Sequence, residues 1–150
     1  MAEAVRAQGN APVYLTFDKS SVAPGVWEGT VEGDVEGGLT TNLLDLRVTG
    51  AIWHVEFDWI VDAGDQSFTA RLTGVLNTNT GRVVMHGTVI EGWLEGARVH
   101  EEGQLIDPDT LRFQGIIRLM PATADWVLAL ARGDTGDAPP DVGQPNYVER

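Results

Sequence analysis

One stretch of the chain indicates the fold most clearly: residues 52–61, which read Ile52-Trp53-His54-Val55-Glu56-Phe57-Asp58-Trp59-Ile60-Val61. Successive side chains of a β-strand point to opposite faces of its sheet. On that rule one face of the stretch is apolar and carries Trp53, Val55, Phe57, Trp59 and Val61. The other face carries His54, Glu56 and Asp58 between two isoleucines. The stretch therefore predicts a strand with one face toward a core and the other toward water.

Turn-forming residues separate seven further apolar stretches from this one. The predicted strands cover residues 13–17, 26–36, 39–49, 52–61, 68–76, 82–91, 97–106 and 111–120. Eight strands close a barrel whose interior holds side chains or one small ligand. We therefore expect an all-β fold, an eight-stranded antiparallel barrel in a single domain (1–132). A short N-terminal arm (1–11), a short C-terminal helix (123–132) and a flexible tail (133–150) complete the predicted organisation.

Composition excludes several classes of function. The 22 acidic residues outnumber 10 basic ones and give a net charge of -12, a field that repels phosphate backbones and anionic membranes. We expect neither nucleic acid nor membrane as a partner. The chain has no cysteine, which excludes disulfides, zinc-thiolate sites and cysteine nucleophiles. No apolar run matches a membrane span or a signal-peptide core, so we expect a cytoplasmic protein, although a mature secreted form also fits.

The apolar face of the other strands carries glycines in the same phase as bulky side chains. They are Gly29, Gly33, Gly74, Gly87, Gly103 and Gly115. Small residues beside large aromatic ones are typical of the inside of a curved barrel. We therefore place this face inside and expect the glycines to leave space in the lumen.

Large side chains of the inner phase form the predicted ligand-binding set. They are Trp27, Trp53, Phe57, Trp59, Met85, Trp93 and Phe113. Ligand cavities are mostly apolar, but the same residues could also fill a core with no cavity. Buried tryptophans need a partner for the indole N–H, and four on one inner face favour a pocket.

Two carboxylates of the inner phase, Glu91 and Glu101, are the candidate catalytic residues. A carboxyl in an apolar lumen has its pKa raised by desolvation and can serve as a general acid or base. The alternative is that both lie at a rim or beyond a bulge, in water. His86 and His100, together with His54 or Glu102, are candidate metal ligands, but their spacing does not define a site. We expect no metal and no cofactor.

The spacing of strands and glycines along the chain resembles that of a known barrel family. It runs through Gly29-Thr30-Val31, Phe68-Thr69-Ala70-Arg71, Arg82-Val83-Val84-Met85-His86-Gly87 and Phe113-Gln114-Gly115. The pattern is similar to the barrel shared by allene oxide cyclases, dirigent proteins and their bacterial relatives, over about residues 13–120. The resemblance implies an apolar lumen for a hydrophobic ligand, cyclase or isomerase chemistry in some members, and homo-oligomers. No stretch matches the catalytic residues of those families, so none is assigned here, and lipocalin-like barrels share much the same rhythm.

The leading functional hypothesis is therefore a barrel that binds a small hydrophobic molecule in its lumen, as a cofactor-independent cyclase or isomerase. The alternative is a non-catalytic structural or protein-interaction barrel. The sequence leaves open whether the protein is an enzyme. An open lumen separates the two hypotheses, because only the first requires one.

Overall fold

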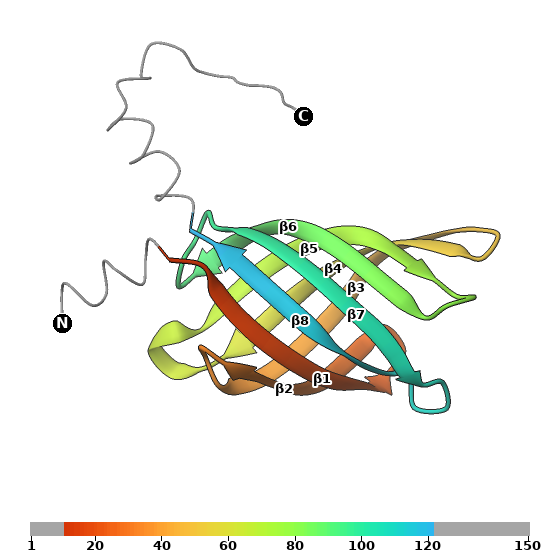
Figure 1. The fold of residues 1–150 in the computed structure, drawn as a ribbon, viewed down its shortest axis with the longest axis horizontal. Coiled ribbons are helices and arrows are strands. Elements are labelled where there is room, and N and C mark those ends of the chain that lie inside the picture. The colour runs from red at the N-terminus through yellow and green to blue at the C-terminus, as the bar shows by residue number, and fades with distance from the viewer. Residues whose placement is uncertain (1–10, 122–150) are drawn as a thin grey trace, which may run out of the picture.

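The computed structural model describes residues 11–121, which form a closed barrel of eight antiparallel strands (Figure 1). The strands are β1 (Val13–Ala23), β2 (Val26–Gly33), β3 (Gly37–Thr49), β4 (Ile52–Asp62), β5 (Phe68–Asn77), β6 (Arg82–Gly92), β7 (Arg98–Asp107) and β8 (Arg112–Met120). Each strand pairs with the next in sequence, and β8 pairs with β1 to close the barrel. A single 3-10 turn, η1 (Gly64–Gln66), connects β4 to β5.

The predicted all-β, eight-stranded antiparallel barrel is confirmed. The predicted helix (123–132) and tail (133–150) lie outside the described residues, as does the arm (1–11) except for its last residue. Two predicted strand limits differ markedly from the structure. β1 continues to Ala23 through a polar stretch, and β2 ends at Gly33, where a positive φ of 118° turns the chain. Within the described residues no helix is long and apolar enough to cross a membrane.

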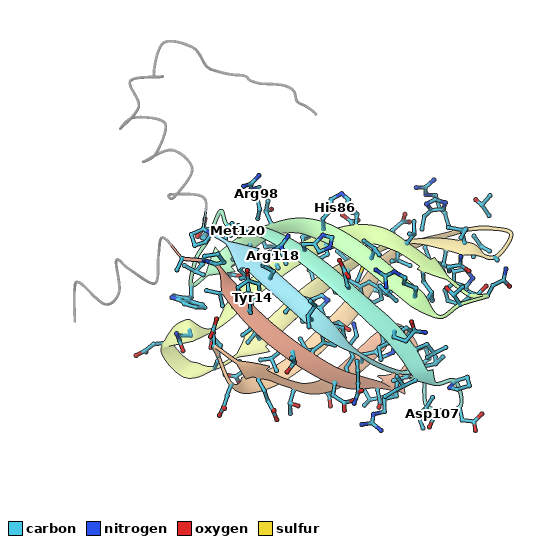
Figure 2. The ribbon with its side chains drawn as sticks, viewed as in Figure 1. Tyr14, His86, Arg98, Asp107, Arg118 and Met120 are labelled. Atoms are coloured by element: carbon cyan, nitrogen blue, oxygen red, sulfur yellow. The ribbon has the colours of Figure 1, made fainter. Side chains whose placement is uncertain are left out.

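The face assignment of β4 is confirmed. Val55, Phe57 and Trp59 are buried, whereas Glu56 and Asp58 lie on the outer face. On the outer face charged side chains pair across strands: Arg71 Nε on β5 donates to Asp58 Oδ1 on β4 at 2.8 Å. Figure 2 shows the same outward orientation for other polar side chains, among them His86, Arg98 and Arg118.

Glycines of the inner phase allow neighbouring strands to approach closely. A Cβ atom at Gly29 would overlap the backbone carbonyl oxygen of Asp18 on β1, and one at Gly115 would overlap that of Glu102 on β7. These positions therefore bend and coil the barrel wall. The expectation that the inner glycines leave open space in the lumen is wrong at these two positions, because neighbouring backbone already occupies that space.

The two ends of the barrel differ. At the end where β1 begins and β8 finishes, buried apolar side chains pack together, among them Val35, Val61, Phe68 and Leu119. The opposite end carries the β1–β2, β3–β4, β5–β6 and β7–β8 connections, which lie on the right in Figure 1. The cavity described below lies in that half.

Candidate functional site

An apolar cavity of about 170 Å³ lies inside the barrel near the end that carries the β1–β2 and β7–β8 connections. Its lining residues are Lys19, Trp27, Leu43, Trp53, Val55, Phe57, Leu76, Thr78, Val83, Met85, Glu101, Leu105, Leu111 and Phe113. Trp53 and Leu111 are 37% and 42% exposed, so the cavity reaches the surface at this rim. Apolar cavities of about 150 Å³ bind benzene in another protein, so this one has the size for a small apolar molecule.

Aromatic side chains form one wall of the cavity. The Trp27 ring packs edge-on against Phe57 and Phe113, with centroids 5.5 and 6.5 Å apart. Trp27 Nε1 donates a hydrogen bond of 3.0 Å to the carbonyl oxygen of Leu111. Because the indole N–H is satisfied by backbone and the ring is packed on two sides, Trp27 is held in place as a rigid apolar surface.

Lys19, the only lysine of the chain, is buried at the inner part of this cavity. It lies on β1, where alternate residues point inward, and only 5% of it is exposed. Its Nζ donates to Thr41 Oγ1 at 3.3 Å. Four aromatic rings surround the Nζ atom, with centroid distances of 5.0 Å (Trp59), 5.2 Å (Phe57), 5.6 Å (Phe17) and 5.8 Å (Trp27). Ring faces attract a cation at such distances, so this aromatic cage stabilises an ammonium group that has lost its water.

Glu101, on β7, is the second charged residue that lines the cavity and is 1% exposed. Desolvation by burial raises the pKa of its carboxyl group to about 7, against a smaller opposite effect of the positive charge of Lys19. The indole N–H of Trp59 also favours the charged form, although Trp59 Nε1 and Glu101 Oε1 do not reach hydrogen-bond geometry and each lacks a partner. A buried polar atom without a partner costs about 1–3 kcal/mol. Glu101 lines the cavity, so a polar group of a ligand there can satisfy its Oε1 atom.

The two buried ionisable groups act on each other without touching. Desolvation lowers the pKa of Lys19, and the negative charge of Glu101 opposes that shift. The contacts of the described residues include no direct ion pair between them. The pKa of about 7 allows the Glu101 carboxyl group to give and take protons near pH 7, which is the usual condition for acid–base chemistry. The lowered pKa of Lys19 increases the fraction of its amine that is neutral.

The structure brings most of the predicted site residues together. Trp27, Trp53, Phe57, Met85, Phe113 and Glu101 all line the cavity. Trp59 is fully buried and lies against Lys19 and Phe17, outside the cavity lining. Its ring supports the lysine and does not form a wall for a ligand.

Two predicted site residues lie away from the cavity. Trp93 packs at the opposite end of the barrel against Phe68, with ring centroids 6.4 Å apart. Glu91 is exposed on the outside, because the β5–β6 register shifts between Thr69 and Ala70. Across that bulge Thr69 pairs with Glu91, whereas Ala70 pairs with Val89, so the inward phase of β6 ends before Glu91. The structure therefore separates both residues from Glu101.

Sequence reasoning missed Lys19. The sequence predicts Glu91 and Glu101 as the ionisable residues of the inner face and no lysine there, and the buried Lys19 corrects that prediction. The signal was present in the alternation of Val13, Leu15 and Phe17, which places position 19 on the inner face. The polar residues that follow Phe17 concealed it, because they read as the end of the strand.

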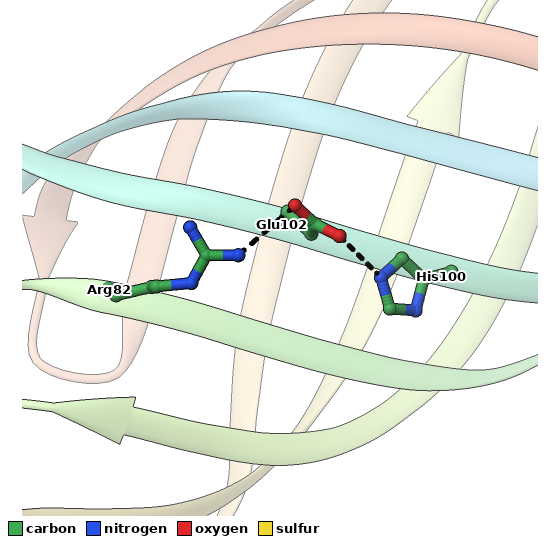
Figure 3. A network of polar contacts seen from close by, with 3 residues as sticks. All are labelled: Arg82, His100 and Glu102. Carbon is green, nitrogen blue, oxygen red and sulfur yellow. Dashed lines mark hydrogen bonds and ion pairs between the residues drawn. The ribbon is translucent and has the colours of Figure 1, made fainter.

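The histidines weighed as metal ligands lie on the outer surface. His86 and His100 pair directly across β6 and β7, but Glu102 contacts His100 Nε2 at 3.0 Å and accepts a 3.2 Å hydrogen bond from Arg82 Nη2 (Figure 3). The described residues contain no group of three or more His, Cys, Asp or Glu side chains that could hold a metal ion. Exposed pairs of this kind contribute little to stability.

Comparisons of the chain with protein-family models, with curated proteins and with solved structures found no match.

Proposed function

We propose that the protein binds a small apolar molecule in the cavity and holds one polar group of that molecule against Lys19 and Glu101. The observation that carries this proposal is the composition of the cavity wall. Apart from Thr78, its lining is apolar except where Lys19 and Glu101 meet it. Apolar surface supplies affinity for such a ligand, and a few polar groups set its orientation.

The pair also supports acid–base chemistry on the bound molecule without a cofactor. The pKa of Glu101 is raised to about 7, so this carboxyl group exists in both protonation states near neutral pH. It can therefore donate or accept a proton at an atom that the cavity holds beside it. Acid- or base-catalysed isomerisations and cyclisations of apolar substrates use such a proton transfer in a shaped, water-poor cavity.

A titration with 1-octanol tests the binding proposal. Trp27 and Trp53 line the cavity, so we expect a saturable change in tryptophan fluorescence. Val83→Phe places a larger side chain in the cavity and should weaken or abolish that change. Val84→Phe is the matched control, since Val84 is the next residue of β6 and lies outside the lining. Absence of saturation in the wild type, or equal effects of the two variants, would contradict the proposal and favour a barrel without ligand-binding function.

A further inference from the structure

We propose that Lys19 forms a reversible imine with an apolar aldehyde or ketone held in the cavity, and that Glu101 is the proton donor of that reaction. The inference rests on the proposed function, because the carbonyl compound must first enter the cavity. It goes further by assigning a covalent step, a nucleophile and a class of ligand.

The placement of Lys19 is the first argument. Lysine is almost never buried unless it is paired, and here the single lysine of an acidic chain is 5% exposed and faces an apolar cavity. A surface role would need an exposed amine. A desolvated amine in an apolar pocket is instead the setting in which lysine acts as a nucleophile toward carbonyl compounds.

The ionisation of the amine is compatible with this role. Only a neutral amine attacks a carbonyl carbon, and burial lowers the pKa of Lys19. Each unit by which the pKa falls increases the neutral fraction at a pH well below the pKa about tenfold. The protonated carboxyl of Glu101, whose pKa is raised to about 7, lines the same cavity.

The proposed reaction needs only the amine, the carbonyl compound and the proton of Glu101. The lone pair of Lys19 Nζ forms a bond to the carbonyl carbon, and the carbonyl oxygen becomes a hydroxyl group as a proton moves to it from nitrogen. Glu101 then protonates that hydroxyl group, the carbon–oxygen bond breaks and water leaves. The products are a protonated imine on Lys19, the carboxylate of Glu101 and one water molecule.

The surroundings of Lys19 suit that product. A protonated imine is a cation, and the four rings at 5.0–5.8 Å from Nζ would stabilise it as they stabilise an ammonium group. Glu101 would balance its charge, and Glu101 Oε1 has no hydrogen-bond partner in the protein. The aromatic cage and the unpartnered carboxylate oxygen therefore point to the same charged intermediate.

Reductive trapping tests the proposal. The folded protein is incubated with octanal and sodium cyanoborohydride at neutral pH, and the octyl adduct is located by peptide mass spectrometry. Because Lys19 is the only lysine, the α-amino group of the chain is the one other primary amine, and it serves as an internal reference. Lys19→Met and Lys19→Arg should lose the adduct at position 19 and retain labelling of the α-amine.

A relocated lysine is the matched control for reactivity. Arg47 has 74% of its side chain exposed, so the double variant Lys19→Met with Arg47→Lys presents one lysine to water. We expect Lys19 in the wild type to react several-fold faster than this exposed lysine, because its lowered pKa gives it a larger neutral fraction. Glu101→Gln should slow adduct formation at Lys19, whereas Glu102→Gln, its exposed neighbour, should not.

Binding of 1-octanol, which cannot form an imine, separates the two proposals. Saturable octanol binding without an adduct at Lys19, or with labelling no faster than at the exposed lysine, would overturn the imine and leave the binding site intact. Failure of both octanol and octanal to bind would reject the proposed function and the imine together.

Discussion

Lys19 and Glu101 line one cavity from strands that are not neighbours, since β8 lies between β1 and β7 in the barrel. They influence each other's ionisation without forming a direct ion pair. Desolvation is the largest effect on both, and it raises the pKa of the acid while lowering that of the base. The barrel thus places an acid with a raised pKa and a base with a lowered pKa on the wall of one apolar cavity, and the first two predictions follow from that relationship.

Glu101 should make stability depend on pH between its two pKa values. The carboxyl group has an ordinary pKa of 4.5 and a folded-state value of about 7. A raised pKa means that the folded state binds the proton more tightly, so its stabilising effect is complete below about pH 4.5 and is lost as the pH rises to about 7. At about 1.4 kcal/mol per pKa unit, the loss is of the order of 3 kcal/mol.

Urea unfolding of wild type and Glu101→Gln at several pH values measures this effect. The free energy of unfolding of the wild type, relative to the variant, should fall from pH 4.5 to 7. Glu102→Gln is the control. The hydrogen bond between Glu102 and His100 lowers the pKa of Glu102, so Glu102 titrates below the range from pH 4.5 to 7. A constant difference between wild type and Glu101→Gln would refute the buried, protonated carboxyl.

Replacing Lys19 by Met should move the titration of Glu101 to higher pH. The positive charge of Lys19 lowers the pKa of Glu101, so its removal leaves desolvation less opposed. The window of pH-dependent stability should therefore extend above pH 7 in the variant. Infrared absorption of the protonated carboxyl group, followed by titration, would detect the shift. An unchanged titration would mean that the two groups are not coupled.

Phe57→Ala should destabilise the barrel by about 3–5 kcal/mol, the range for removing a buried phenylalanine ring. The ring is 7% exposed and packs against Trp27. Glu56→Gln, one residue away on the outer face, should change the free energy of unfolding by less than about 0.5 kcal/mol. Equal losses in denaturant unfolding would contradict the orientation of β4.

Gly115→Ala should also destabilise the barrel, through crowding. An added Cβ atom would overlap the backbone of Glu102 on β7, and relief of such overlap in a packed wall costs about 1–3 kcal/mol. Gly38→Ala is the matched control, because a Cβ atom at that strand position meets nothing within 4 Å. Thermal unfolding of the two variants checks the prediction, and a loss in Gly38→Ala as large as in Gly115→Ala would count against it.

The alternation of apolar and polar residues was enough to predict the barrel and much of its interior. The alternation in residues 52–61 correctly places Val55, Phe57 and Trp59 inside, because a strand with one buried face must repeat every second residue. The same phase identified Glu101 as an inward carboxylate. The resemblance to allene oxide cyclases and dirigent proteins stays a prediction.

The errors came from features that a period-two pattern does not encode. A bulge between paired strands changes the phase at one residue, which moved Glu91 to the outside. Trp93 shares the apolar phase of the inner face, but it lies at the packed end of the barrel and does not line the cavity. The alternation pattern does not encode position along the barrel axis. Lys19 was missed because a charged residue on an inner face is rare, and a polar stretch is normally interpreted as the end of a strand.

The most direct test of the central claim is a crystal structure of the protein with 1-octanol. The account predicts one octanol molecule in the cavity, its chain against Trp27, Phe57 and Phe113 and its hydroxyl group within hydrogen-bond distance of Lys19 Nζ or a Glu101 carboxylate oxygen. A cavity filled by the protein's own side chains, or octanol bound only on the outer surface, would contradict it.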